Sequence, residues 1–332
     1  MAQNAKSPAF RLLISAGRLL VTAGLLALLV VRVDPRQLGT VLAHGALMPF
    51  VAAVLVLAAA TPVVALRWHS ILSGQGSPGW RTLLKILWLG LFFNQVLPSG
   101  VGGDAMRAWR CRKLGLGLGV AVRSILLDRA CGYAVLVTIY AACLPALLRV
   151  VREPLQQRTL VAVLAAAATG LAAMFLLDRL PGRVVRLRAI APFAELARDA
   201  RRLVTDPLRI VGLLLLSSIG IGLAIFSIAL VAMSVGITIP FGDWLMIVPP
   251  VTFIQLLPVS LAGWGVREVA LVVILAAFGI PAATALAASL AIGISLLLVA
   301  LPGGLIWAGN WDQSAGIVPA AAAPDLPQGP RA

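Results

Sequence analysis

Long stretches of apolar residues, separated by short polar segments, run through most of the chain. A helix of about 20 apolar residues crosses the ~30 Å hydrocarbon core of a bilayer. Such runs predict spanning helices at about residues 12–33, 48–66, 130–148 (or from about 122), 159–177, 210–235 and 284–307. The expected fold class is all-α, a polytopic membrane helix bundle in one transmembrane domain at residues 1–310. The Ala- and Pro-rich residues 311–332 are expected to form a disordered tail.

Two further apolar segments are too short and too broken to span. Leu83–Leu97 offers about 15 helical residues, or roughly 22 Å, before Pro98 and several glycines end it. We interpret this segment as the first arm of a re-entrant hairpin that returns through Asp104–Lys113. Trp244–Leu257 and Val266–Gly279 form a second pair of arms. Such backbone is tolerated at membrane depth only where protein buries it or water reaches it.

The two breaks resemble each other. Gln95-Val-Leu-Pro98 returns as Gln255-Leu-Leu-Pro258, 160 residues later, and Arg107 aligns with Arg267 at the same offset. The flanking spans follow this offset, which gives repeat halves at about 12–157 and 158–310. An odd number of crossings between corresponding positions inverts the second half. Broken helices at corresponding positions of inverted halves are typical of a transporter's substrate site.

The arginines favour a topology with the N-terminus inside. Most of them fall in loops 67–85, 103–123 and 179–209, on the side where positive charge accumulates, although loop 149–158 violates this rule. Residues 179–206 are amphipathic and basic, which predicts an interfacial helix pair. Five tryptophans near predicted interfaces are interpreted as belt anchors rather than ligand contacts: Trp68, Trp80, Trp88, Trp109 and Trp264.

The composition excludes several classes of protein. Apolar residues make up 61% and charged residues 12% of the chain, and the mean hydropathy is +1.00, so a soluble globular protein is not expected. The net charge of +15 is explained by topology and anionic lipid headgroups, and nucleic acid is not an expected partner. Three scattered cysteines and two distant histidines predict neither a disulfide framework nor a metal site. With no catalytic constellation or nucleotide-binding loop, we expect neither a cofactor nor an enzyme.

The first break carries groups that suit an anionic ligand. Asp104 is a good N-cap, and glycine-rich turns at a helix N-terminus present free N–H groups to an anionic oxygen. Arg107 and Arg110 lie one turn apart on one helix face, where they could together bind a phosphate. The alternative is that Asp104 pairs with Arg107 and the arginines only fix orientation.

The second break contains a single arginine in a long uncharged stretch. Arg267 is not needed for topology, and a charge at depth is costly without a role, so a headgroup contact is favoured. The alternative is a structural pair with Glu268 or Asp243. Asp128-Arg129, which precedes the next span of the first half, is interpreted as a buried pair that holds the hairpin. The candidate substrate-binding residues are Asn94, Gln95, Pro98, Gly100, Gly102, Gly103, Asp104, Arg107, Arg110, Asp128, Arg129, Gln255, Pro258, Gly263, Gly265, Arg267 and Glu268.

These motifs carry a family resemblance. The stretch Asn94–Arg107, Leu126–Arg129 and Leu257–Glu268 together resemble the flippase-like transmembrane family, which includes the membrane half of bacterial lysylphosphatidylglycerol synthases. The resemblance covers about residues 12–310. It implies a bundle with re-entrant hairpins that binds or moves amphipathic lipids, often in polyprenyl, glycolipid or hopanoid pathways. Ser260 and Ala262 replace Gly100 and Gly102 in the second motif, which puts the equivalence of the two sites in question.

The functional prediction combines both lines of reasoning. The synthases carry a soluble aminoacyl-transfer domain after the membrane half, whereas this chain ends at Ala332, so lysyl transfer is not expected. We expect a multi-pass protein of the bacterial inner membrane that binds or translocates an anionic or phosphate-bearing lipid. The alternative is a lipid-binding scaffold that recruits a lipid-synthesis enzyme through residues 179–209.

Overall fold

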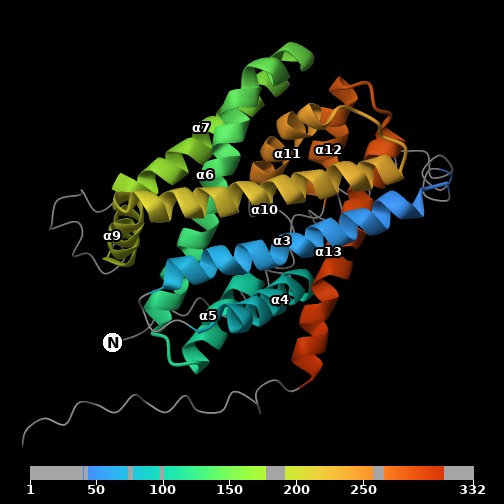
Figure 1. Ribbon diagram of the computed structural model, residues 1–332. Coiled ribbons are helices and arrows are strands. Elements are labelled where there is room, and N and C mark those ends of the chain that lie inside the picture. Colours follow the sequence, from blue (N-terminus) through green and yellow to red (C-terminus); the bar gives the residue numbers. More distant parts are fainter. Residues whose placement is uncertain are drawn as a thin grey trace, which may run out of the picture.

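The computed structural model describes residues 40, 44–73, 78–97, 101–176, 191–256 and 265–309, and within these ranges it contains helices and no strands. The helices are α3 (Leu47–Leu72), α4 (Trp80–Val96), α5 (Gly102–Lys113), α6 (Leu118–Val150), α7 (Pro154–Leu176), α9 (Ala191–Thr205), α10 (Pro207–Ser234), α11 (Phe241–Gln255), α12 (Val266–Ala277) and α13 (Ala282–Ala308) (Figure 1). Helices α3, α6, α7, α10 and α13 are long and apolar enough to cross a membrane. The all-α, multi-pass prediction is therefore confirmed. The predicted span at 12–33 and the tail at 311–332 lie outside the described residues.

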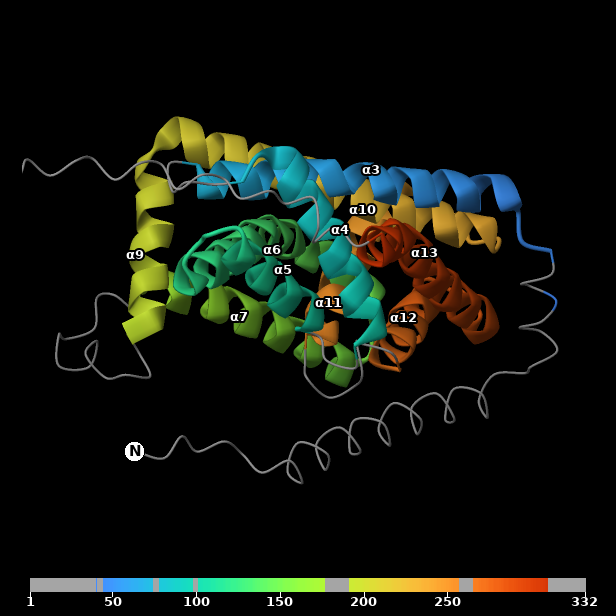
Figure 2. The same cartoon turned by 90° about the horizontal axis from the view of Figure 1, so that it is seen from below.

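Helices α3 and α10 lie side by side and run antiparallel (Figures 1 and 2). The start of α3 meets the end of α10, where the Ala46 amide donates to the Ser234 carbonyl oxygen at 2.8 Å. At the opposite ends of the pair, Arg209 Nη2 donates to the Ser70 carbonyl oxygen at 2.6 Å. The two helices occupy corresponding positions in the proposed halves. Their opposite directions are what an inverted repeat requires.

Each predicted break separates two short helices. α4 has 17 residues and α11 has 15, which correspond to about 25 and 22 Å of helix. Beyond the breaks, α5 packs against α4 and α12 packs against α11. Gly265, immediately before α12, has a φ of 87°, a left-handed conformation that glycine adopts without the steric cost of a side chain.

The helices form two sets, α3–α6 in the first proposed half and α10–α13 in the second, and their packing is reciprocal. α4 packs against α13 and α11 packs against α6, so each first arm contacts the long helix of the other set. Each return arm contacts the long helix that follows it, α5 with α6 and α12 with α13. A Cβ added at Gly303 of α13 would overlap the Trp88 carbonyl of α4, so these backbones approach closely. The pattern agrees with two related halves, while the re-entrant depth of the arms and the inverted repeat stay predictions.

Helix α3 extends beyond its predicted span, and α6 agrees with the earlier of its two predicted starts, near residue 122. α3 continues through Arg67 and Trp68 to Leu72, and α6 begins at Leu118, so Asp128 and Arg129 lie well inside it. Both helices continue because the charged side chains find partners on neighbouring helices. Trp68 is fully buried, so its interpretation as a belt anchor is wrong.

The basic helix α9 uses its apolar face for packing within the protein. Leu196, Ala200 and Leu203 are buried in a cluster with Ile71, Leu127 and Leu213 of α3, α6 and α10. Arg123 of α6 ties α9 further, donating to Asp199 at 2.7 Å and to Glu195 at 2.6 Å. The amphipathic pattern that predicted an interfacial helix is thus satisfied for α9 by these protein neighbours, while residues 179–190 lie outside the described residues.

Candidate functional site

Helices α3, α4, α5, α6, α10, α11 and α13 surround a partly open cavity of about 380 Å³. Half of its lining residues are aliphatic: Leu57, Ala60, Val64, Leu87, Leu91, Leu136, Ile221, Ala224, Ile225, Ile228, Val248, Leu296 and Val299. Its polar lining consists of Thr61, Arg67, Asn94, Gln95, Asp104, Arg107, Asp128, Arg129, Tyr133 and Thr252. All the charged groups come from α3, α5 and α6, whereas α10, α11 and α13 contribute one hydroxyl, that of Thr252.

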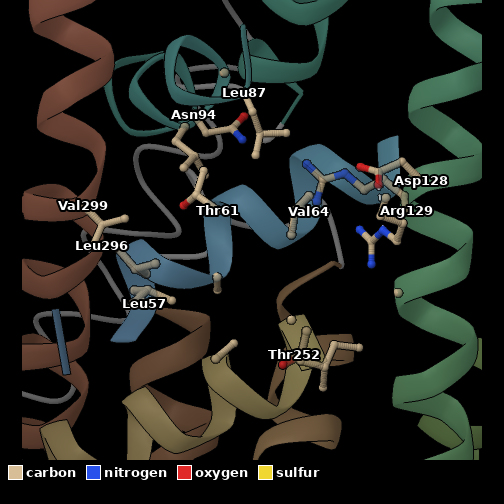
Figure 3. A pocket seen from close by; sticks show the side chains of 18 of the residues that line it. Leu57, Thr61, Val64, Leu87, Asn94, Asp128, Arg129, Thr252, Leu296 and Val299 are labelled. Atoms are coloured by element: carbon tan, nitrogen blue, oxygen red, sulfur yellow. Dashed lines mark hydrogen bonds and ion pairs between the residues drawn. The ribbon is translucent and has the colours of Figure 1, made fainter. Parts of the chain in front are cut away.

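The cavity has a charged side and an apolar side. Figure 3 shows Asp128 and Arg129 extending from α6 at one side, with Leu57, Leu296 and Val299 at the other. Thr61, Asn94 and Thr252 lie between them (Figure 3). A cavity with this division suits a ligand that is polar at one end and apolar at the other.

The charged side is an alternating chain of three guanidinium groups and two carboxylates. Asp128 accepts from Arg67 Nε at 2.8 Å and from Arg107 Nη2 at 3.0 Å. Asp104 accepts from Arg107 Nη1 at 3.3 Å and from Arg129 Nε at 3.0 Å. Arg67 Nη1 also donates to Ser217 Oγ of α10 at 3.1 Å. The chain therefore connects α3, α5, α6 and α10 around the cavity.

Arg107 is the central member of this chain, and its position is fixed by packing on two sides. Its guanidinium carbon lies 4.1 Å from the centre of the Trp68 ring, within the range of a cation–π contact. Trp68 Nε1 donates in turn to Ser124 Oγ at 3.0 Å. On the other side, a Cβ added at Gly90 of α4 would come within 2.9 Å of Arg107 Cγ. Arg107 Nε is buried and has no hydrogen-bond partner in the described part of the chain, so it can still donate.

The junction between α4 and α5 depends on an asparagine and a glycine of the first break. Asn94 Oδ1 accepts from the Gly103 amide at 2.8 Å, which satisfies one of the free N–H groups at the start of α5. A Cβ on Gly103 would overlap the Gly90 carbonyl oxygen and the Asn94 side chain. Gly103 is therefore required for the close approach of the two arms, which brings Arg107 to the cavity.

The second break forms a separate buried cluster. Arg267 Nη2 donates to Glu268 Oε1 at 2.6 Å, and Arg267 Nε donates to Ser289 Oγ of α13 at 3.1 Å. Glu268 Oε2 also accepts from the Gly265 amide at 2.5 Å and caps the start of α12. None of these residues lines the cavity. In this structure Arg267 therefore has the structural pairing with Glu268 that was the alternative to a headgroup contact.

The structure gathers about a third of the candidate residues at the cavity. Those that line it are Asn94, Gln95, Asp104, Arg107, Asp128 and Arg129. Asp128 and Arg129 contact the return arm as expected, although each pairs with a residue of α5 rather than with the other. Gly102 and Gly103 lie at the start of α5, and Gln255 ends α11 away from the cavity lining. Pro98, Gly100, Pro258 and Gly263 lie outside the described residues.

Arg110 does not join Arg107 at the cavity. Its side chain is buried, and its guanidinium carbon lies 5.0 Å from the centre of the Trp109 ring. The geometry therefore does not support a clamp in which both arginines hold one headgroup in this cavity.

Sequence reasoning missed several groups of the site. Arg67, Thr61, Tyr133 and Thr252 line the cavity, and Ser217 and Trp68 hold two of its arginines. One signal was present for Arg67, because Asp128 in an apolar helix needs a positive partner on another helix. No comparable signal marks the hydroxyl groups, because threonine and serine are common in membrane helices.

The chain was compared with known proteins. A family model described as the lysylphosphatidylglycerol synthase TM region matches residues 13–303. No curated protein matches the chain. The match covers the α3–α13 bundle and both breaks, so this multi-pass membrane protein belongs to the lysylphosphatidylglycerol synthase transmembrane-region family.

Proposed function

We propose that this protein binds an anionic, phosphate-bearing lipid and moves it between the leaflets of the bacterial inner membrane, without modifying it chemically. The observation that carries the proposal is the cavity with one charged and one apolar side. Its charged side places the phosphate, and its aliphatic side accommodates the first part of the acyl or prenyl chains. The rest of the tails remains in the surrounding lipid, because about 380 Å³ is too small for a whole lipid.

Charge balance supports an anionic headgroup. Three guanidinium groups and two carboxylates line the cavity, so one positive charge has no acidic counterpart among the described lining residues. A buried charge of this kind is costly unless a ligand compensates it. Arginine is also well suited to phosphate, since its planar guanidinium group can donate two parallel hydrogen bonds to two phosphate oxygens.

The two short arms support movement of the bound lipid. α4 and α5 form one wall of the cavity, and they contact the rest of the protein through α3, α6 and α13. A hairpin that shifts against these helices would open the cavity to one leaflet or the other. Transport would then be downhill or driven by an ion gradient.

The proposal is tested by replacing the central arginine. Arg107→Ala is expected to lower lipid translocation at least about tenfold, because a hydrogen bond from a charged group contributes ~1.5–3 kcal/mol. The measurement is scrambling of labelled anionic phospholipid in proteoliposomes, with equal amounts of folded protein. Arg112→Ala is the matched control, since Arg112 is an exposed arginine of the same helix.

An unchanged rate in Arg107→Ala contradicts the proposed role of the cavity. Arg110→Ala adds a separate comparison. If Arg110→Ala lowers lipid translocation as much as Arg107→Ala does, both arginines bind the headgroup, contrary to what the cavity geometry supports.

A scaffold that recruits a lipid-synthesis enzyme is the second candidate. The observation that favours it is α9, which exposes Arg198 and Arg202 while its apolar face packs within the protein. Charge reversal of both arginines separates the two functions. A scaffold loses capture of its partner, whereas a transporter keeps its scrambling rate in vesicles that contain no other protein.

A further inference from the structure

The Asp104–Arg129 pair is the most accessible part of the charged chain. The Arg129 side chain is 38% exposed and that of Asp104 is 18%, against 6% for Arg107 and 3% for Asp128. Both residues line the cavity. A ligand entering the cavity therefore meets this pair before the deeper Arg67–Asp128–Arg107 group.

The contact between these two residues has the geometry of a bound anion. Arg129 donates through Nε to Asp104 Oδ2 at 3.0 Å and through Nη2 to Oδ1 at 3.2 Å. Two parallel hydrogen bonds from one guanidinium are the arrangement with which arginine binds a carboxylate or a phosphate. The carboxylate of Asp104 thus occupies the site on Arg129 that a phosphate would take.

Asp104 would keep a partner after leaving Arg129. It already accepts from Arg107 Nη1 at 3.3 Å, and Arg107 Nε is buried without a partner among the described residues. The exchange therefore exposes no unpaired carboxylate. After the exchange, Arg129 pairs with the phosphate of the ligand and Asp104 pairs with Arg107.

We propose that Asp104 is an exchangeable internal counterion of Arg129, displaced by a lipid headgroup that carries a single phosphodiester. This inference rests on the proposed function and narrows its substrate class. With one phosphodiester charge bound, three guanidinium groups face three anionic groups and the cavity is neutral. A phosphomonoester, with a charge of about −1.5 to −2, exceeds that balance. A zwitterionic headgroup brings an ammonium group that the cavity does not balance.

The exchange predicts that removing the internal carboxylate strengthens binding. Asp104→Asn is expected to lower the Kd for dioctanoyl phosphatidylglycerol about tenfold, because this lipid no longer competes with a charged hydrogen-bond partner. The preference should also shift towards dioctanoyl phosphatidic acid, since the cavity gains one net positive charge. The measurement is calorimetric titration of both lipids, and of dioctanoyl phosphatidylcholine, into the full chain in detergent. Asp199→Asn, which removes an equal charge from an ion pair on α9, should leave all three Kd values unchanged.

The double variant Asp104→Asn/Arg129→Gln should lose the gain. If the double variant still binds phosphatidylglycerol more tightly than the wild type, the proposed displacement of Asp104 is overturned. It is also overturned if Asp104→Asn has a wild-type melting temperature but an unchanged or higher Kd. If Asp104→Asn does not fold, Arg129→Gln alone decides, with an expected rise in Kd of about tenfold. Failure of the wild-type protein to bind any of the three lipids overturns the proposed function as well. Lipid binding that depends on Arg107 but not on Asp104 or Arg129 overturns only this inference.

Discussion

Replacement of Asp128 by alanine is expected to destabilise the protein by about 3–5 kcal/mol, the range found when one partner of a buried ion pair is removed. Asp128 is 2% exposed and accepts hydrogen bonds from Arg67 at 2.8 Å and from Arg107 at 3.0 Å. The variant leaves two buried guanidinium groups without their shared counterion. Lipid translocation should be lost together with stability, because Arg107 loses the nearer of its two carboxylate partners.

The measurement is the free energy of unfolding in detergent, followed by tryptophan fluorescence. Asp199→Ala is the matched control, because Asp199 also bridges two arginines but its side chain is 23% exposed, against 3% for that of Asp128. An ion pair that solvent reaches contributes only ~0–1 kcal/mol to the free energy of unfolding. Equal, small effects in the two variants would show that the charged chain around the cavity does not stabilise the fold.

The second large effect is expected in the other half of the molecule. Glu268→Ala should also cost about 3–5 kcal/mol, since Glu268 is fully buried and its partner Arg267 is 7% exposed. The substitution additionally removes the acceptor of the Gly265 amide at the start of α12. The same unfolding measurement applies, and a loss below about 1 kcal/mol would contradict a buried structural pair.

A double substitution separates structure from ligand binding at this second site. Replacing a buried ion pair by apolar residues of similar volume is often neutral, so Arg267→Leu/Glu268→Leu should recover much of the lost stability. If the pair is only structural, the recovered protein transports lipid at the wild-type rate. If Arg267 contacts a headgroup at another stage of transport, translocation stays low in a stable protein.

The helices and their breaks could be predicted from the sequence because their signals are local. Apolar runs define α3, α6, α7, α10 and α13, and Pro98 and Pro258 mark where α4 and α11 give way to breaks. The same local reasoning ended α3 too early, and of the two starts that it offered for α6, the one near residue 122 is close to the observed Leu118. Arg67 marks a boundary in the sequence pattern, although its partner Asp128 on another helix allows it to lie inside a span.

The assembly of the site could not be predicted, because it depends on which helices become neighbours. Asp128 had many arginines available along the chain, and only the packing of α3 against α6 selects Arg67. The side-chain contacts of Arg107 and Arg267 differ for the same reason. The offset of 160 residues aligns the two arginines. In the fold, however, Arg107 lines the cavity and pairs with Asp128 of α6, whereas Arg267 donates to Ser289 of α13.

The reciprocal packing of the first arms also has a consequence for biogenesis. α4 is made early in synthesis, but the helix that covers it, α13, is the last of the described helices to leave the ribosome. Neither set of helices can complete its core from its own sequence, so the nascent first half must wait in the membrane with the α4 surface around Trp88 uncovered. A chain truncated before α13 should therefore be inserted but remain a substrate for membrane proteases. Two separately expressed halves should become resistant to proteolysis only when they are produced together.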